Sequence, residues 1–302
     1  MICGIVDVGS NTIRLSLYRC EAEGNHLLMH RKVMAGLASY VEGGRLSAEG
    51  VQVVCRVLSG YRALLDNLGI GPMYVFATAS LRNVSNTEAV VAEILAETGL
   101  TVDVISGEEE AALSFRGALL GITHDSGLLL DLGGGSTELL EYENRSILSA
   151  YSLPIGSLNL FNRYVAQLHP TKAECKAIRG EVEAQLDQAH VELRPAAHIC
   201  GVGGTVRAAC KVANYFFDRP EDCRVLTAEE LRQLVKLCKR IDRETIQALL
   251  KVAPERIHTL VPGLLVLDTI CQRCGGADIT ASACGVREGY LHTRVLGEKE
   301  HE

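Results

Sequence analysis

One short pattern occurs twice in the chain, and it constrains the fold more than any other feature. The first copy reads I-V-D-V-G-S-N-T-I-R-L at 5–15, and the second reads L-L-D-L-G-G-G-S-T-E-L at 129–139. Each copy is an apolar strand ending in Asp, a turn of small residues that tolerates tight backbone, and a second apolar strand. Two such hairpins, one opening each half of the chain, predict two related domains that face each other.

Helices and strands are expected to alternate after each hairpin. Residues 46–68 carry apolar side chains at helical spacing, and Ser47 is the expected N-cap. Thr227 and Glu230 have the spacing of a capping box. This alternation of strands and helices indicates an α/β fold. The other predicted segments are strands at 73–77, 101–105 and 198–200 and helices at 87–97, 107–122, 158–168, 172–193, 228–241 and 254–274.

The bulk composition agrees with two globular domains. The chain has 302 residues, of which 47% are hydrophobic and 22% are charged. The turn-forming residues at 124–127 mark a boundary, so the domains are expected at 1–124 and 125–302. Eleven cysteines are spread thinly over the chain, and the one close pair, Cys271 and Cys274, is better explained by helix packing than by zinc. Reduced thiols in a cytoplasmic protein are the simplest reading.

Charge and hydropathy exclude several classes of protein. The net charge of −7 argues against general binding of nucleic acid or of an anionic membrane. The first apolar stretch contains Asp7 and Arg14, so it does not read as a signal peptide. No run of about twenty apolar residues predicts a membrane-spanning helix. Any polyanionic substrate must therefore be attracted by local groups.

Three turns have the composition of a phosphate-binding site. Small residues leave backbone N–H groups available, and concave rows of such groups bind anions. A turn at a helix start adds the helix dipole. One such turn alone is better explained as a tight hairpin, whereas three favour phosphate binding. The residues are Gly9, Ser10, Asn11 and Thr12 in the first turn, Gly133, Gly134, Gly135, Ser136 and Thr137 in the second, and Gly203, Gly204 and Thr205 in the third.

Carboxylates beside two of these turns are candidate metal ligands. Phosphoryl transfer needs charge neutralisation, usually by magnesium (Mg²⁺), which takes a few carboxylates and keeps several waters. Asp131 lies at the end of its strand and Glu138 follows the turn, while Asp7 holds the position of Asp131 in the first hairpin. A single Asp at a strand end is often only a turn former, but its repetition favours a role with metal or metal-bound water.

The acidic segment at 106–111 is the candidate source of a general base. Ser106 and Glu109 fit a capping box, and Glu108 suits the positive end of a helix. Glu110 has no such structural explanation, although a solvated glutamate fits its spacing equally well. Arg82 can clamp a terminal phosphate with its planar guanidinium group, the alternative being a surface ion pair.

In combination, these motifs resemble the exopolyphosphatase and guanosine pentaphosphate phosphatase family, within the superfamily of sugar kinases, heat-shock chaperones and actin. They occur in family order along nearly the whole chain. Besides the two hairpins, the matching stretches are A-T-A-S-L-R at 77–82, V-I-S-G-E-E-E-A at 104–111, S-L-P-I-G-S at 152–157, G-V-G-G-T-V-R-A at 201–208 and G-V-R-E-G-Y-L at 285–291.

The resemblance implies two ribonuclease-H-like (actin-like ATPase) domains with an active-site cleft between them. It implies magnesium near Asp131 and Glu138 and a catalytic glutamate within 108–110, with Glu110 at the position of the family's proposed base. It also implies that Arg82 contacts phosphate. The residues that it places in the phosphate loops are Asn11, Arg14, Ser136, Gly203, Gly204 and Thr205.

The expected activity is release of terminal orthophosphate from inorganic polyphosphate, with guanosine pentaphosphate as the alternative substrate. Longer relatives carry additional helical domains, so this chain is expected to be the short two-domain form and to prefer short polyphosphate. A homodimer is expected from the resemblance alone. The rival readings are a kinase of the same superfamily and a nucleotide-binding switch without catalysis.

Overall fold

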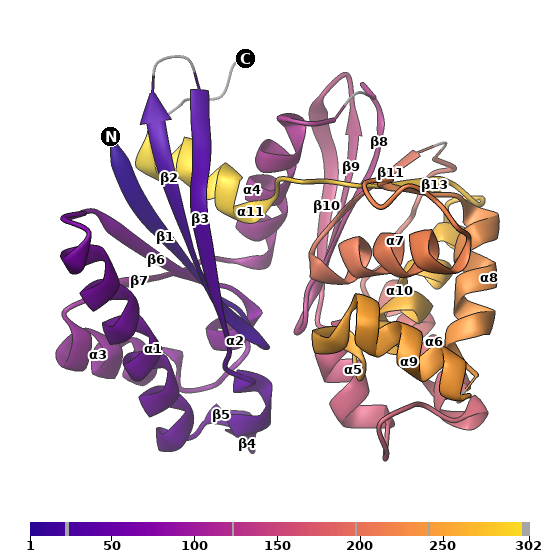
Figure 1. Cartoon of the computed structure of the whole chain (residues 1–302), viewed down its shortest axis with the longest axis horizontal. Coiled ribbons are helices and arrows are strands. Elements are labelled where there is room, and N and C mark those ends of the chain that lie inside the picture. Colours follow the sequence, from indigo (N-terminus) through magenta and orange to yellow (C-terminus); the bar gives the residue numbers. More distant parts are fainter. Residues whose placement is uncertain (22–23, 123, 197, 241, 298–302) are drawn as a thin grey trace. The chain divides into compact units, whose positions relative to one another are not determined.

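The structure, a computed structural model, describes residues 1–21, 24–122, 124–196, 198–240 and 242–297. Its contacts divide the chain into two compact units, Met1–Glu110 with Tyr290–Glu302 and Ala111–Gly289. Each unit contains a sheet with helices packed against it (Figure 1). None of the helices in the described ranges is long and apolar enough to cross a membrane.

The first unit is built on a five-stranded sheet with the order β3-β2-β1-β6-β7. Three antiparallel strands continue into two parallel ones, because β1 pairs antiparallel with β2 and parallel with β6. The strands are β1 (Ile2–Val8), β2 (Thr12–Glu21), β3 (Gly24–Met34), β6 (Met73–Ala77) and β7 (Val102–Val104), with a separate hairpin of β4 (Val41–Glu42) and β5 (Arg45–Leu46). The helices are η1 (Leu37–Tyr40), α1 (Ala48–Asn67), α2 (Ala79–Arg82), α3 (Thr87–Thr98) and the start of α4 (Gly107–Leu119).

Helices α1 and α3 cover one face of this sheet and form its main core (Figure 1). Helix α1 begins where the sequence predicts, since the hydroxyl of Ser47 accepts a hydrogen bond from Gly50 N at 3.2 Å. Its buried stripe includes Val54, Leu58 and Leu65, which are 0% exposed. Each such side chain contributes roughly 1.5–3 kcal/mol by leaving water.

The second unit is built on a six-stranded sheet with the order β10-β9-β8-β11-β13-β12. Strand β8 is buried on both faces, because several helices cover one face and α4 covers the other. The strands are β8 (Gly127–Leu132), β9 (Thr137–Glu143), β10 (Ser146–Leu153), β11 (His198–Val202), β12 (Val225–Leu226) and β13 (Asp278–Ala281). The remaining helices are α5 (Ser157–Tyr164), α6 (Lys172–Gln188), α7 (Gly204–Phe216), α8 (Ala228–Cys238), α9 (Arg243–Val252), η2 (Pro254–Arg256), α10 (Leu260–Arg273), α11 (Val286–Tyr290) and a π-helical turn, η3 (Leu291–Val295), which belongs to the first unit.

The two sheets share one topology, so the predicted repeat and the α/β class are confirmed. In each sheet a meander of three antiparallel strands is followed by two strands parallel to the first. The registers also agree, because Asp7 pairs with Arg14 across β1–β2 and Asp131 pairs with Glu138 across β8–β9. The repeated sequence therefore specifies the same hairpin geometry twice.

Several elements differ from the sequence predictions in their limits. Helix α10 begins at Leu260 rather than at 254, because Pro254 opens the separate 3₁₀ turn η2. The pattern at 158–168 yields a helix that already ends at Tyr164. Helix α9 was not predicted, although Asp242 caps it by accepting a hydrogen bond from Thr245 N at 2.7 Å.

Helix α4 starts in the first unit and from Ala111 onward belongs to the second. Its buried residues Ala111 and Phe115 pack on the face of the second sheet opposite the main helices. Conversely, Tyr290 belongs to the first unit, where its ring stacks on Phe76 at 4.7 Å and its hydroxyl donates to Asp103 Oδ2 at 3.1 Å. The domain limits expected from the sequence were 1–124 and 125–302. The contacts instead group residues from Ala111 onward with the second unit, because the apolar stripe of α4 is buried on the second sheet.

Glycines allow two backbones to touch within the second unit. A Cβ on Gly117 would lie 1.9 Å from the carbonyl oxygen of Gly285. A Cβ on Gly289 would lie 1.8 Å from the carbonyl oxygen of Leu113. Real Cβ atoms do not approach backbone so closely, so any side chain at these positions must push the two segments apart.

We therefore expect Gly117→Ala to lower the free energy of unfolding of the second unit by about 1–3 kcal/mol, the usual cost of overpacking. Gly180→Ala is the matched control, since Gly180 lies within α6 of the same unit and a Cβ there meets nothing within 4 Å. That substitution should raise stability by about 0.5–1 kcal/mol through helix propensity. Chemical denaturation measures both, and equal effects would contradict the close packing.

Candidate functional site

A backbone hydrogen bond closes the turn of the second hairpin, and hydrogen bonds with the start of α5 hold the turn in place. Gly133 N donates to Ser136 O at 3.0 Å. The carbonyl of Gly133 accepts from Ser157 N, and that of Gly134 accepts from Leu158 N, both at 3.0 Å. The side chain of Asn159 donates to Gly135 O at 2.9 Å. These contacts hold the carbonyls of all three turn glycines against the start of α5.

The segment 152–157 can lie against this turn because Gly156 has no side chain. A Cβ on Gly156 would come within 2.4 Å of Gly134 O. Two hydroxyls of the predicted phosphate turn are also buried, since Ser136 is 3% and Thr137 0% exposed. The hydroxyl of Thr137 donates to Ile155 O at 2.5 Å, so it holds the turn in place.

Asp131 and Glu138 lie directly opposite each other across β8 and β9. They are 8% and 1% exposed, so both carboxyl groups are nearly removed from water. Ser114 of α4 donates its hydroxyl to Asp131 Oδ2 at 2.5 Å, and Ser152 of β10 donates to Glu138 Oε1 at 3.0 Å. Two buried negative charges side by side are costly, and a neighbouring positive group, a bound cation or a proton lowers that cost.

The third turn lies against this acidic pair. Gly203 has φ 102°, a conformation that favours glycine. A Cβ on it would lie 2.6 Å from Leu132 O and 3.2 Å from Asp131 Oδ1. The fold of the second unit thus brings Asp131 and Glu138, the turn at 133–137 and the turn at 203–205 together from three separate segments.

Arg256 is a neighbour of the third turn that the sequence analysis missed. Its guanidinium Nη2 lies 2.3 Å from the position that a Cβ on Gly204 would occupy. Thr205 is 0% exposed and its hydroxyl donates to Ser157 Oγ at 3.4 Å, so this side chain anchors the turn to α5. No motif pointed to Arg256, because it belongs to a 3₁₀ turn about fifty residues further along the chain.

Asp131 and Glu138 are better suited to a hard divalent cation that keeps several waters than to a metal ion that is held by protein ligands alone. Among the described residues, no three or more His, Cys, Asp or Glu side chains are grouped so that they hold a metal ion. Mg²⁺ typically takes one or two carboxylates and completes its shell with waters and substrate phosphates. Asp131 and Glu138 supply that number of carboxylates.

The first unit repeats the turn geometry with different chemistry. Gly9 N donates to Thr12 O at 3.1 Å, as Gly133 does to Ser136. The carbonyls of Ser10 and Asn11 accept from the segment at 36–38, which replaces the α5 brace. Asn11 is 9% exposed, and its Nδ2 has no hydrogen-bond partner among the residues that the structure describes. A buried donor without an acceptor is costly, and an anion at this turn would satisfy it.

Asp7 and Arg14 occupy the positions that Asp131 and Glu138 hold in the second unit. Here an acidic residue faces a basic one, so the two charges offset each other within the unit. The repeat is therefore asymmetric in charge. The second hairpin, with its two facing carboxylates, is therefore the better candidate for a metal site.

Glu110 and Arg82 form an ion pair within the first unit. Arg82 Nη1 lies 2.7 Å from Glu110 Oε2 and also donates to Ile105 O at 3.2 Å. Glu110 is 7% exposed, so it is not the solvated glutamate of the alternative reading. The ion pair and its backbone anchor fix the direction of the Glu110 carboxylate.

Glu109 has structural partners at both carboxylate oxygens. Its Oε2 accepts from Ser106 N at 2.9 Å, and its Oε1 accepts from Arg294 Nη2 at 2.6 Å. Hydrogen bonds with Ser106, first from its backbone N–H and then with its side chain, lower the pKa of Glu109, and the charge of Arg294 lowers it further. The capping box expected between Ser106 and Glu109 is confirmed by the return bond from Glu109 N to Ser106 Oγ at 3.1 Å.

The comparisons with known proteins agree on one family. The family model described as "Ppx/GppA phosphatase family" matches residues 18–298. Exopolyphosphatase 1 of Mycobacterium tuberculosis is 25% identical, over 99% of this chain and 90% of its own length. Exopolyphosphatase 2 of the same species is 29% identical, over 94% and 95% of the two chains.

Solved structures show the same fold. The crystal structure of an exopolyphosphatase from Cytophaga hutchinsonii superposes with a TM-score of 0.85 at 22% identity and covers 99% of both chains. The Ppx/GppA family member from Aquifex aeolicus superposes with a TM-score of 0.80 at 25% identity, again over 99% of both chains.

The acidic pair generates a prediction that needs no activity assay. In EDTA, Glu138→Gln should raise the free energy of unfolding by about 0.2–1 kcal/mol, because it removes one of two facing negative charges. Saturating magnesium should stabilise the wild type, by about 2.7 kcal/mol at a hundredfold excess over Kd, and the variant far less. Thermal denaturation with and without the ion measures both effects.

Glu141→Gln is the matched control on the same strand. Glu141 is 9% exposed, but its oxygens accept from Ser149 Oγ at 3.1 Å and from Arg194 N at 2.8 Å. This variant should keep the full magnesium response. An equal loss of that response in both variants would remove the case for a metal at Asp131 and Glu138.

Proposed function

Because the chain belongs to the Ppx/GppA phosphatase family, we propose that it is an exopolyphosphatase, which hydrolyses the terminal phosphoanhydride bond of inorganic polyphosphate. Two relatives that align with at least 94% of this chain carry the name exopolyphosphatase. The observation that carries the proposal is the buried pair of carboxylates, Asp131 and Glu138, beside two turns of small residues. A phosphoryl-transfer enzyme needs this combination of charge neutralisation and anion binding.

We assign magnesium to Asp131 and Glu138, with the hydroxyls of Ser114 and Ser152 orienting the two carboxylates. When bound, the ion would neutralise charge on the phosphate oxygens. Asp7, the third candidate ligand, is a weaker one because it faces Arg14 in its own sheet.

Glu110 is the proposed general base. It would take a proton from the attacking water while the water oxygen forms a bond to the terminal phosphorus. The bond from that phosphorus to the bridging oxygen breaks, and the bridging oxygen stays on the shortened chain. Arg82 holds the carboxylate in position through the 2.7 Å ion pair. Glu109, also a candidate, already has a structural role, since it caps α4 through Ser106 and pairs with Arg294.

The turns are the proposed phosphate sites. In the second unit, the candidate donors are backbone N–H groups of the turn at 133–137, other than that of Gly133, and those at the start of α7, and Arg256 adds positive charge beside Gly204. In the first unit, the residues at 9–12 and Arg14 are the candidates, and Nδ2 of Asn11, which has no partner within the described ranges, is a further donor. The preference for short polyphosphate over guanosine pentaphosphate, the homodimer and the cytoplasmic location stay predictions.

The decisive experiment measures phosphate release with magnesium from short polyphosphate, long polyphosphate and guanosine pentaphosphate. We expect Glu110→Gln to lower kcat by about 10²–10⁴, the usual contribution of a general base, and to leave substrate binding largely intact. Glu109→Gln is the matched control, because it changes the neighbouring glutamate and should lower kcat far less.

Other outcomes would overturn defined parts of the proposal. If the wild type releases phosphate from none of the three substrates, a kinase or a binding switch becomes the better reading. If guanosine pentaphosphate is cleaved best, the alternative substrate replaces polyphosphate. If Glu109→Gln lowers kcat as much as Glu110→Gln, the assignment of the base is wrong and the hydrolase stands.

A further inference from the structure

Two of the eleven cysteines differ from the rest in exposure. Nine thiols are buried, whereas Cys223 and Cys284 are partly exposed. Burial raises the pKa of most of the others, for example that of Cys200 to about 12. It also raises the pKa of Cys284. Cys223 is therefore the thiol whose surroundings need an explanation.

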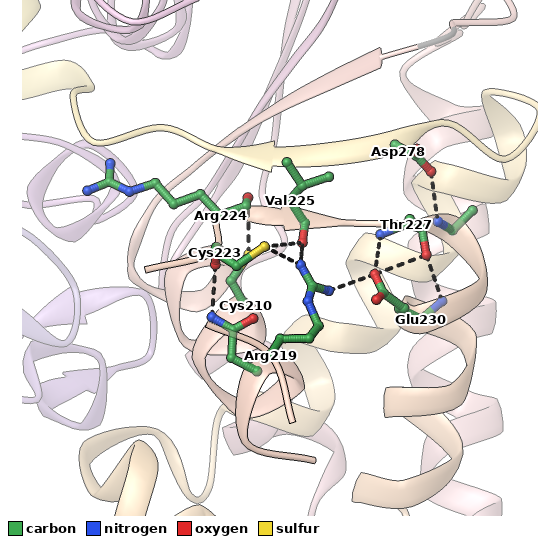
Figure 2. A network of polar contacts seen from close by, with 10 residues as sticks. Cys210, Arg219, Cys223, Arg224, Val225, Thr227, Glu230 and Asp278 are labelled. Carbon is green, nitrogen blue, oxygen red and sulfur yellow. Dashed lines mark hydrogen bonds and ion pairs between the residues drawn. The ribbon is translucent and has the colours of Figure 1, made fainter. Parts of the chain in front are cut away.

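A polar network surrounds Cys223 in the loop that joins α7 to β12 (Figure 2). The guanidinium group of Arg219 donates to Cys223 Sγ and to the carbonyl of Val225, each at 2.5 Å. It also forms an ion pair with Glu230 at 2.7 Å. The hydrogen bond with the Val225 backbone, and then that from Arg219, lower the pKa of Cys223. A positive group beside a partly exposed sulfur favours the reactive thiolate.

A second thiol lies beside the same loop. Cys210 of α7 is 3% exposed, and its Sγ contacts Arg224 O at 3.5 Å. One helical turn later, Asn214 Nδ2 donates to Cys223 O at 2.9 Å. Cys210 and Asn214 thus lie on one face of α7, and residues 223 and 224 run along that face. Burial, and the nearby Cys223 among its charged neighbours, raise the pKa of Cys210 to about 11.

Asn214 supplies an independent observation. It is 5% exposed, and its Oδ1 has no hydrogen-bond partner among the described residues. A buried amide oxygen without a donor is costly. A sulfenic acid formed at Cys223 carries an O–H group, which is a hydrogen-bond donor of the kind that Asn214 Oδ1 needs.

We propose that Cys223 and Cys210 form a redox-active dithiol that a hydroperoxide converts into a disulfide. The Cys223 thiolate attacks one peroxide oxygen, the O–O bond breaks, and Cys223 becomes a sulfenic acid while hydroxide leaves. The sulfur of Cys210 then attacks the sulfenic sulfur, loses its proton and displaces the hydroxyl group as water. The two thiols give up two electrons and the peroxide accepts them.

The order of the steps follows from the surroundings of the two thiols. Cys223 reacts first because it is partly exposed and lies beside Arg219. Cys210 is buried and without a cationic hydrogen-bond donor of its own among the contacts described, so it reacts only with the sulfur that is brought to it. In the disulfide, the sulfur of Cys223 no longer carries the charge that Arg219 binds. The ion pair between Arg219 and Glu230 remains in the disulfide form. Glu230 also belongs to the capping box of α8.

The test treats the full-length chain with hydrogen peroxide and maps its peptides by mass spectrometry without reduction. Trypsin releases Cys210 in peptide 208–211 and Cys223 in peptide 212–224, since Pro220 protects the bond after Arg219. We expect a disulfide between these two peptides that dithiothreitol reverses. In Cys210→Ser, dimedone should label Cys223 as a trapped sulfenic acid.

Two further variants separate this proposal from general oxidation. Arg219→Gln should slow alkylation of Cys223 by iodoacetamide severalfold at neutral pH, because loss of the positive group raises the pKa of the thiol and lowers its thiolate fraction. Cys284→Ser, the matched change at the other partly exposed thiol, should leave the disulfide unaffected. Faster oxidation of Cys284 than of Cys223, or Cys223 oxidised without linkage to Cys210, would overturn the dithiol. Both readouts are independent of phosphatase activity.

Discussion

Two carboxylates that face each other across one pair of strands are the constraint on which the rest of the second unit depends. Asp131 and Glu138 are both more than nine-tenths buried, and the hydroxyls around them add no positive charge. Like charges that face each other across a sheet do not stabilise it, so the pair is a candidate site for a bound cation. The turns beside it, with α5 bracing one and Gly203 pressed against Asp131, can be understood as the surroundings of that cation and its phosphate ligands.

The first hairpin can be compared with the second within the same chain, because the pattern is repeated. Both hairpins have the same register and the same closing hydrogen bond, from Gly9 to Thr12 and from Gly133 to Ser136. The residue opposite the Asp differs, being Arg14 in one sheet and Glu138 in the other. The same backbone geometry thus places opposite charges on facing strands in the first unit and like charges in the second.

Much of the fold was predictable because it rests on local patterns. The two hairpins, the Ser47 cap and the capping box of Thr227 and Glu230 are specified by residues close together in the chain. Much of the candidate site was not. Arg256 and Ser114 come near the turn and the acidic pair only through tertiary packing, and no short motif marks them. Likewise, the spacing of Glu110 could not exclude a solvated side chain, whereas its ion pair with Arg82 does so for the folded chain.

The first unit contains both ends of the chain, and this has a consequence for the order in which its parts are synthesised. The first unit includes Tyr290, whose ring covers Phe76, so its residues are not contiguous in the sequence. During synthesis, the sheet of the first unit emerges from the ribosome first, yet one of its faces is completed only after the whole second unit has been translated. Until Tyr290 has been translated, Phe76 has no ring stacked on it, so the early sheet exposes apolar surface that is prone to aggregation.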